Sequence, residues 1–140
     1  MSKMRVEVVS TEQLIFSGEA EFVVAPATEG EIGVYPQHVP LLTRIKPGVL
    51  RLKVPGAKEE VLVAVSGGMM EVQPSLITVL ADTAIRGEDL DEARANEAKR
   101  AAEDALKRAT DDMSTAKAHA ALAVAIAELK TLDYLKKRAH

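Results

Sequence analysis

Hydrophobic and polar positions follow two different patterns along the chain, and the pattern changes near Gly87. Before that residue, short apolar or alternating runs recur between residues that favour turns. The runs are RVEVVS, EAEFVVA, GVLRLKV, EEVLVAVSGG, MMEVQ and LITVLAD, which begin at Arg5, Glu19, Gly48, Glu59, Met69 and Leu76. Runs of this length and spacing are typical of a small antiparallel sandwich or barrel. We therefore predict an all-β domain over residues 1–87.

Glycine and proline mark the reversals between these runs. The pairs are Pro47-Gly48, Pro55-Gly56, Gly67-Gly68 and Pro74-Ser75. These residue types supply the backbone dihedrals that tight turns require. No long helix fits between the turns, so the first domain is predicted to be β throughout.

After Gly87 the apolar positions follow helical spacing. Asp89 is a plausible N-cap with Glu92 three residues later, an acidic form of the capping box, and the helix is expected to run to about Ala109. The segment TDDMST then lacks apolar periodicity, and a second helix follows. One face of that helix is predicted to carry Leu122, Ile126, Leu129 and Leu132. Residues 88–140 are therefore predicted to form an antiparallel helical hairpin.

The seam of this hairpin is expected to be rich in alanine. The first helix would contribute Ala98, Ala101, Ala102, Ala105 and Ala109. Alanine buries little apolar area, so the hairpin would be only marginally stable alone. The run AALAVAIA, Ala120 to Ala127, is apolar on every side, so either the β domain or a partner must cover part of it.

Composition follows the same division. All eight Gly and all six Pro lie at or before Gly87, whereas Val and Ile are almost confined to that part of the chain and Ala is abundant after it. β-Branched residues favour strands and alanine favours helices. A formal net charge of -3, spread over both halves, argues against a nucleic-acid partner. The absence of Cys suits a reducing compartment.

Catalytic and metal-binding patterns are missing from the sequence. His38, His119 and His140 have no metal-ligand spacing, and the glycines of SGGMMEV precede a strand rather than the helix that a phosphate-binding loop opens. The first residues contain no apolar stretch typical of a secretory signal. The longest apolar run has eight residues, far fewer than the roughly 20 of a membrane-spanning helix.

Four segments together resemble the epsilon subunit family of the bacterial rotary proton-translocating ATP synthase, called delta in mitochondria. They are VEVVSTEQLIFSGEAE, GEIGVYPQHVPLLTRIKPG, VSGGMMEVQPSLITVLADTA and DLDEARANEAKRA. The resemblance implies a ten-stranded β-sandwich followed by a helical hairpin. It also implies a central-stalk subunit that turns with the rotor at the cytoplasmic face of the bacterial inner membrane, associated with the membrane only through the complex. Such a subunit couples proton flow to ATP synthesis without catalysing a reaction.

The same resemblance implies partners. In this family the sandwich binds the gamma subunit and rests on the ring of c subunits. The loop TEGEIGVYPQHVP lies where the family makes these contacts, so Glu29, Glu31 and His38 are candidate interface residues. Its glycines and prolines can equally be explained as shaping a tight loop, and the two explanations are compatible.

The helical hairpin is implied to inhibit ATP hydrolysis when it extends toward the alpha/beta catalytic hexamer. Arg94, Arg100 and Arg108 are candidate contacts for that partner. The motif LDEARA also matches a nucleotide-binding motif of some family members, which makes Asp91, Arg94 and Ala95 a candidate site for ATP as a regulatory ligand, with no cofactor required. Those members use further arginines on the second helix, which has none between Met113 and Lys137 here. Helix capping explains Asp91 and Arg94 equally well.

A function of another class remains open from the sequence, namely a free-standing ATP-binding regulatory module. Tight ATP binding by the isolated chain, without association with a gamma subunit, would favour it.

Overall fold

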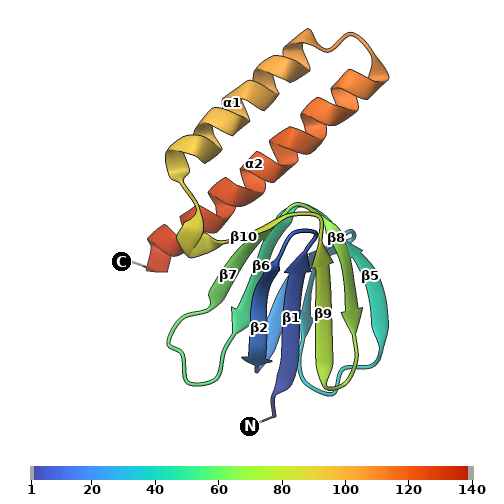
Figure 1. Ribbon diagram of the computed structural model, residues 1–140, viewed down its shortest axis with the longest axis vertical. Coiled ribbons are helices and arrows are strands. Elements are labelled where there is room, and N and C mark those ends of the chain that lie inside the picture. The colour runs from blue at the N-terminus through green and yellow to red at the C-terminus, as the bar shows by residue number, and fades with distance from the viewer. Residues whose placement is uncertain (1, 139–140) are drawn as a thin grey trace.

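Ten β-strands and a pair of long helices form the part of the chain that the computed structural model describes, residues 2–138 (Figure 1). The strands are β1 (Met4–Ser10), β2 (Leu14–Ala20), β3 (Phe22–Ala27), β4 (Gly30–Val34), β5 (Leu41–Ile45), β6 (Gly48–Lys53), β7 (Val61–Val65), β8 (Gly68–Val72), β9 (Leu76–Ala81) and β10 (Ala84–Arg86). The helices are α1 (Glu92–Arg108) and α2 (Asp112–Arg138). The expected ten-stranded sandwich followed by a helical hairpin is confirmed.

The strands form one continuous sheet that folds over on itself. Its order is β10-β7-β6-β3-β5-β8-β9-β1-β2, with β4 paired to the free side of β3. The fold occurs between β3 and β5, which are joined by the single residue pair Ala27 and Ile45. All pairs are antiparallel except β1 with β9, which run parallel from Arg5 opposite Leu76 to Ser10 opposite Ala81. Two layers result, and Figure 1 shows β2, β1, β9, β8 and β5 in the nearer one.

The hydrophobic core lies between the two layers. Alternate residues of each strand point inward, because successive side chains of a strand lie on opposite faces. Val6 and Val8 of β1 lie with Ile77 and Val79 of β9 and Met70 of β8 in this core, all fully buried. The period of two in the sequence therefore corresponds to the observed burial.

The Gly67-Gly68 turn confirms the expectation that glycine is needed at a reversal. Both residues have positive φ, 120° and 139°. A Cβ atom added at Gly68 would lie 2.1 Å from the carbonyl oxygen of Leu80, so any side chain there would collide with the β9 backbone. Glycine at this position lets β8 pair closely with β9.

Three strands lack a clear signal in the sequence. β4 contains two glycines, β10 has three residues, and β5 carries Leu42 as well as Arg44 on the face that points outward. The run EAEFVVA is divided at Glu21, because its first residues end β2 and its remainder belongs to β3. These elements form because neighbouring strands provide backbone partners, a contribution that local sequence does not record.

The predicted N-cap of the first helix is wrong. Asp89 ends a short 3₁₀ turn, Gly87–Asp89, and Leu90 has extended backbone. The cap is Asp91, whose Oδ1 accepts hydrogen bonds from the amides of Ala93 at 2.9 Å and Arg94 at 3.3 Å. The predicted end of the helix near Ala109 is confirmed, since Ala109 is the C-cap.

The predicted seam of the hairpin is partly wrong. Ala102 is buried and Ala109 half-buried, but Ala98, Ala101 and Ala105 are exposed. The inward positions are instead Ala95, Lys99, Ala102, Leu106 and Ala109, which repeat at spacings of four and three. The predicted alanine stripe is rotated about the helix axis by roughly one residue position from this seam. α1 packs against a single neighbouring helix, so it buries only a narrow face.

Helix α2 lies between α1 and the sandwich, where it contacts β6 and β7 as well as α1. Ala118 and Ala125 are buried, as are Ala127 and Thr131, so the apolar run is covered from more than one side. The sandwich therefore provides part of the predicted cover. Ile126, however, is 47% exposed, which corrects its assignment to the packed face.

Candidate functional site

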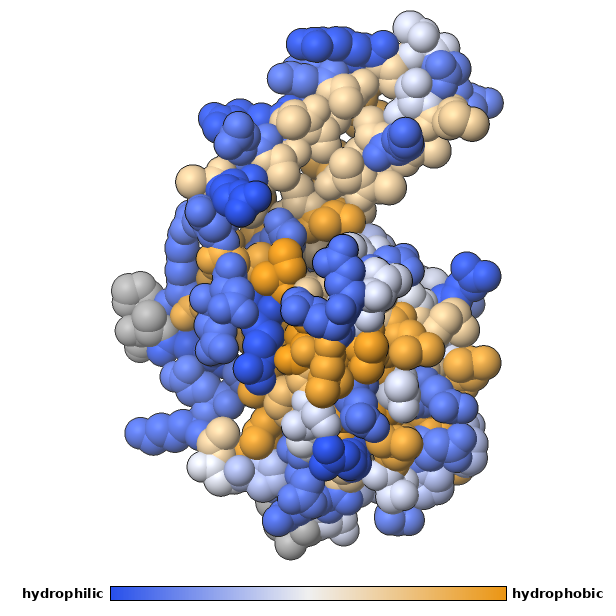
Figure 2. Space-filling model, in the orientation of Figure 1, coloured by the Kyte–Doolittle hydropathy of each residue, from blue (hydrophilic) through white to orange (hydrophobic). Residues whose placement is uncertain are grey.

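An apolar row crosses the outer face of the nearer layer. It consists of Leu14 on β2, Val9 on β1, Leu80 on β9 and Met69 on β8, which lie opposite one another in adjacent strands. Leu42 on β5 lies in the next row, opposite Glu71. We call Leu14, Val9, Leu80, Met69 and Leu42 the outer apolar row. Figure 2 shows hydrophobic atoms across this face of the sandwich.

Three members of the outer apolar row are exposed where a solvated sheet would carry polar side chains, and Val9 and Met69 are half-buried. Leu14 is 57%, Leu80 56% and Leu42 66% exposed. An antiparallel sheet with one solvated face normally alternates apolar and polar residues. Contiguous exposed apolar side chains mark interaction surfaces. The sequence does contain this signal, because LITVLA and LLTRI place apolar residues at outward as well as inward positions.

A cleft of about 710 Å³ continues from the outer apolar row to the hairpin. Met69 and Arg44 lie at its sandwich side, and His119, Ala120 and Ala123 line it from α2. A partner that covers the outer apolar row would therefore also lie beside the docked hairpin.

The three predicted loop residues lie at two ends of one strand. Glu29 is in the turn between β3 and β4, and exposed Glu31 lies opposite Pro26 near that end. His38 follows the other end of β4 and is half-buried. His38 Nδ1 lies 2.7 Å from the carbonyl oxygen of Val39, which only accepts, so Nδ1 carries the proton. The structure thus places these residues on one hairpin and its following loop without bringing them together.

A pocket of about 290 Å³ lies at the start of α1. It is lined by Ile85, Asp89, Leu90, Asp91, Arg94, Ala98 and Glu128. Asp91 and Arg94 of the predicted ATP site are therefore together, but Ala95 points into the helical seam and is buried there.

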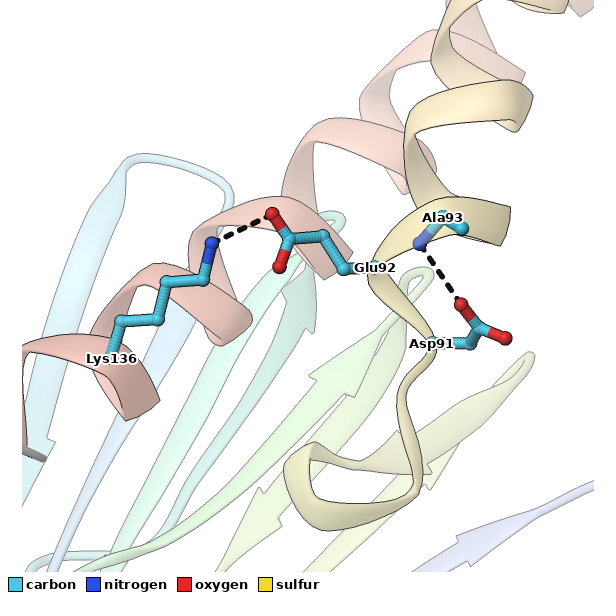
Figure 3. Close-up of polar contacts among 4 residues, drawn as sticks. All are labelled: Asp91, Glu92, Ala93 and Lys136. Atoms are coloured by element: carbon cyan, nitrogen blue, oxygen red, sulfur yellow. Dashed lines mark hydrogen bonds and ion pairs between the residues drawn. The ribbon is translucent and has the colours of Figure 1, made fainter.

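The charge of this pocket is mainly negative. Asp89, Asp91 and Glu128 contribute carboxylates, and Arg94 is the single basic residue among those that line it. Burial raises the pKa of Glu128, and the charge of nearby Arg94 partly opposes that rise. Asp91 also uses Oδ1 to cap α1, as Figure 3 shows for the amide of Ala93. The capping explanation of Asp91 is thus realised in the structure.

The other two arginines proposed for partner contact lie on α1, where both are exposed. Arg100 follows Lys99 near the middle of the helix, and Arg108 is its last residue. Neither is among the residues that line the pocket at Asp91. Both are free of ion pairs within the part of the chain that the structure describes.

Within residues 2–138, no group of three or more His, Asp or Glu side chains is arranged to hold a metal ion. His140 lies outside the described residues. None of the described helices is long and apolar enough to cross a membrane.

Two family models match adjacent parts of the chain. The one described as ATP synthase, Delta/Epsilon chain, beta-sandwich domain matches residues 3–87. The one described as ATP synthase, Delta/Epsilon chain, long alpha-helix domain matches residues 88–133.

Curated relatives cover the whole length. The chain is 99% identical over 140 residues to the ATP synthase epsilon chain of Chromobacterium violaceum, with all of both chains covered. It is 69% identical to that of Laribacter hongkongensis, again over the full length of both.

The fold is also found in solved assemblies. A chain of the Euglena gracilis mitochondrial ATP synthase (OSCP/F1/c-ring, rotational state 1) superposes with a TM-score of 0.79 at 18% identity, covering 100% of this chain and 83% of that one. A chain of the Tetrahymena thermophila mitochondrial ATP synthase central stalk/c-ring superposes with a TM-score of 0.60 at 13% identity, covering 92% and 96%. At these identities the likeness shows the fold alone.

Proposed function

The chain belongs to the ATP synthase delta/epsilon chain family as a non-catalytic subunit of the central stalk, and we propose that it couples rotation to ATP synthesis and restrains ATP hydrolysis. The sandwich joins the rotor, and the hairpin is the inhibitory element. The observation that carries the proposal is the outer apolar row, in which Leu14, Leu42 and Leu80 are exposed on the sandwich.

The gamma subunit is the proposed partner of the outer apolar row. Burying a leucine side chain stabilises a contact by about 1.5–3 kcal/mol. Leu14, Leu42 and Leu80 are more than half exposed in the chain alone, so each has most of this free energy still to gain. Polar groups at the margin, Arg44 and Glu71, would fix the orientation of the partner.

The c-ring is the proposed partner of the loop residues. Glu29 and Glu31 present two carboxylates at one end of β4, and His38 lies at the other end beside exposed Tyr35 and Val39. Contact at both ends would prevent the sandwich from pivoting about a single point. We propose that this assembly holds the chain at the cytoplasmic face of the inner membrane, where it associates with the membrane only through the complex.

Inhibition is assigned to the hairpin. α1 presents Arg94, Arg100 and Arg108 on its exposed surface, and α2 ends in Lys136, Lys137 and Arg138. We propose that these cations contact the alpha/beta catalytic hexamer when the hairpin leaves the sandwich. Charge complementarity of this kind speeds association and fixes register.

No cofactor is proposed, and ATP is at most a weak regulatory ligand. A triphosphate in the pocket at Asp91 and Arg94 would face three carboxylates and one guanidinium. Like charges at this range oppose binding. Equilibrium dialysis of the full chain with ATP tests the point, and tight binding without association with a gamma subunit would favour the free-standing regulatory module instead.

The deciding experiment compares reconstituted ATP synthase containing the full chain with enzyme containing residues 1–87. We expect the shorter chain to raise ATP hydrolysis while ATP-driven proton pumping continues. Equal hydrolysis rates would contradict the inhibitory role of the hairpin. Loss of pumping with the shorter chain would contradict the assignment of coupling to the sandwich.

A further inference from the structure

The polar contacts that hold α2 on the sandwich lie at one end of the helix. Arg138 Nη1 donates a hydrogen bond to the carbonyl oxygen of Glu60, and Arg138 Nε lies 3.3 Å from Glu59 Oε2. The guanidinium of Arg51 on β6 lies 5.4 Å from the centre of the Tyr134 ring, a distance suited to a cation–π contact. Arg51 Nη1 also lies 3.8 Å from Glu60 Oε1. The last two turns of α2 are thus joined to β6 and the loop after it.

The opposite end of α2 lacks such contacts. His119, Ala120 and Ala123 face the sandwich across the cleft of about 710 Å³. Over residues 112–123, no ion pair to the described part of the sandwich is formed. Figure 1 shows the hairpin rising away from the sandwich toward its tip. Docking is therefore concentrated at the C-terminal end of α2.

We propose that Tyr134 and Arg138, together with Arg51, Glu59 and Glu60, form an electrostatic latch that holds the hairpin on the sandwich and whose opening releases it. The charged groups are partly exposed, with the side chains of Arg138 and Glu59 26% and 57% accessible. Partly exposed ion pairs are weakened by salt. The latch therefore responds to modest changes in its charged surroundings.

The latch is also incompletely satisfied. Nε of Arg51 is buried and donates no hydrogen bond to a described residue, whereas Nε of Arg138 faces Glu59 Oε2 at 3.3 Å without hydrogen-bond geometry. A buried donor without a partner lowers the net stability of the state that contains it. The unpaired Nε of Arg51 therefore reduces the free energy by which the docked state is favoured.

Arg138 and the acidic residues of the latch belong to different domains, so they separate when the hairpin is released. Arg138 leaves with the hairpin, whereas Glu59 and Glu60 remain on the sandwich. Neutralising the acidic side therefore weakens docking and leaves the released hairpin unchanged, while neutralising Arg138 changes both. This consequence for inhibition rests on the proposed function, but the latch itself is measurable in the isolated full chain.

Two ion pairs near the latch stay within the hairpin, and one of them provides a control. Lys136 Nζ lies 2.7 Å from Glu92 Oε1 and joins α2 to α1, as Figure 3 shows. Lys137 Nζ lies 3.2 Å from Asp133 Oδ2 within α2. Neither pair reaches the sandwich. Asp133→Asn thus removes one carboxylate from the same end of the helix without touching the latch.

The test measures a distance between the hairpin and the sandwich. Because the chain has no Cys, spin labels can be placed by Glu71→Cys on β8 and Met113→Cys near the hairpin tip, both exposed. The distance distribution is recorded by electron paramagnetic resonance for the chain that carries only the two labels, called the unchanged chain. It is also recorded for the labelled variants Glu59→Gln/Glu60→Gln, Arg138→Gln and Asp133→Asn. Each is measured at low and at high salt.

We expect one main distance in the unchanged chain at low salt and a second, broader population at high salt. Glu59→Gln/Glu60→Gln and Arg138→Gln should each raise the ratio of released to docked chains about fivefold at low salt. A fivefold change corresponds to about 1 kcal/mol, because a tenfold change corresponds to about 1.4 kcal/mol. Asp133→Asn should leave the ratio unchanged. The latch is refuted if both latch variants match Asp133→Asn, or if the unchanged chain is already mainly released at low salt. Neither result depends on ATPase assays of the assembled enzyme, so the two proposals fail separately.

Discussion

Leu80 on β9 lies directly opposite Met69 on β8, and both side chains are on the outer face of the sandwich. Leu80 also pairs with Val9 on β1, so three adjacent strands contribute apolar groups to one line. A core-forming pair would be expected between the layers, but this one lies on the side away from the core. Its position supports the proposal that the gamma subunit covers it.

Replacing Leu80 by Asp should weaken binding to the gamma subunit at least about tenfold, because a buried leucine is worth about 1.5–3 kcal/mol. Thermal stability of the isolated chain should change little, since Leu80 is already 56% exposed. Binding is measured by calorimetry with purified gamma. Met113→Asp, at an exposed apolar position on the hairpin, is the control, and an equal loss in both variants would contradict the assignment.

Charge reversal at Glu31 and His38→Ala should each weaken assembly with a gamma and c-ring subcomplex without unfolding the sandwich. The two residues lie at opposite ends of β4, so their effects should add within about 0.5 kcal/mol. Assembly is measured by co-purification at graded concentrations. Unchanged assembly in both variants would remove these residues from the interface.

A chain that ends at Gly87 should fold. The hydrophobic core is made wholly of residues from Met4 to Ala84, and the hairpin adds none to it. Circular dichroism should show a cooperative unfolding transition with little helix signal. A chain that ends at Ser66 provides the contrast, because it lacks β8 and β9 and leaves β1 without its parallel partner. An unfolded 1–87 chain would show that the boundary between the domains is misplaced.

Protonation of Glu128 should stabilise the hairpin. Burial raises the pKa of this carboxyl above its ordinary value of 4.5, so the folded state binds the proton more tightly than the unfolded state. The resulting stability is complete below pH 4.5 and is lost as the pH rises through the folded-state pKa. Glu128→Gln should therefore raise the unfolding temperature at pH 7. It should also make the unfolding temperature depend less on pH above pH 4.5. Glu103→Gln, on the exposed face of α1, is the control.

The cap of α2 should depend on pH in the opposite direction. The amide of Ser114 donates to Asp111 Oδ1 at 2.7 Å, and this bond lowers the pKa of Asp111 below its ordinary value of 3.8. The cap contributes stability above pH 3.8, and that contribution is lost as the pH falls through the lowered pKa. Asp111→Ala should abolish this acid dependence and fray the start of α2. The fraying is measured as faster hydrogen exchange of the backbone amides in the first turn of α2. Exchange unchanged by the substitution would contradict the capping role.

Pattern alone predicts the two domains because period and composition change together at Gly87. Pattern alone does not predict the cap residue or the buried alanines, because contacts with distant parts of the chain determine them. Asp89 and Asp91 both have the chemistry of a cap, and the 3₁₀ turn at Gly87–Asp89 decides between them. The alanines of α1 are nearly equivalent in sequence, and the direction from which α2 approaches selects Ala95 and Ala102 for burial.

The candidate surfaces show the same limit. The motif around Asp91 and Arg94 is readable, but Glu128 enters that pocket from a helix more than thirty positions later and changes its charge. The outer apolar row depends on cross-strand register, which sets Leu80 beside Met69 and Val9. Register of this kind follows from pairings between distant segments and is not visible in any single run.

The parallel pairing of β1 with β9 determines the order in which the molecule can be completed. β1 is the first strand to be synthesised, and its parallel neighbour β9 is the last but one. The edge of β1 that pairs with β9 therefore stays unpaired while the intervening strands are synthesised. Non-local pairings of this type slow folding and leave strand edges open during that interval. The helices emerge only after all ten strands have been made, so the sandwich can be completed before the hairpin docks on it.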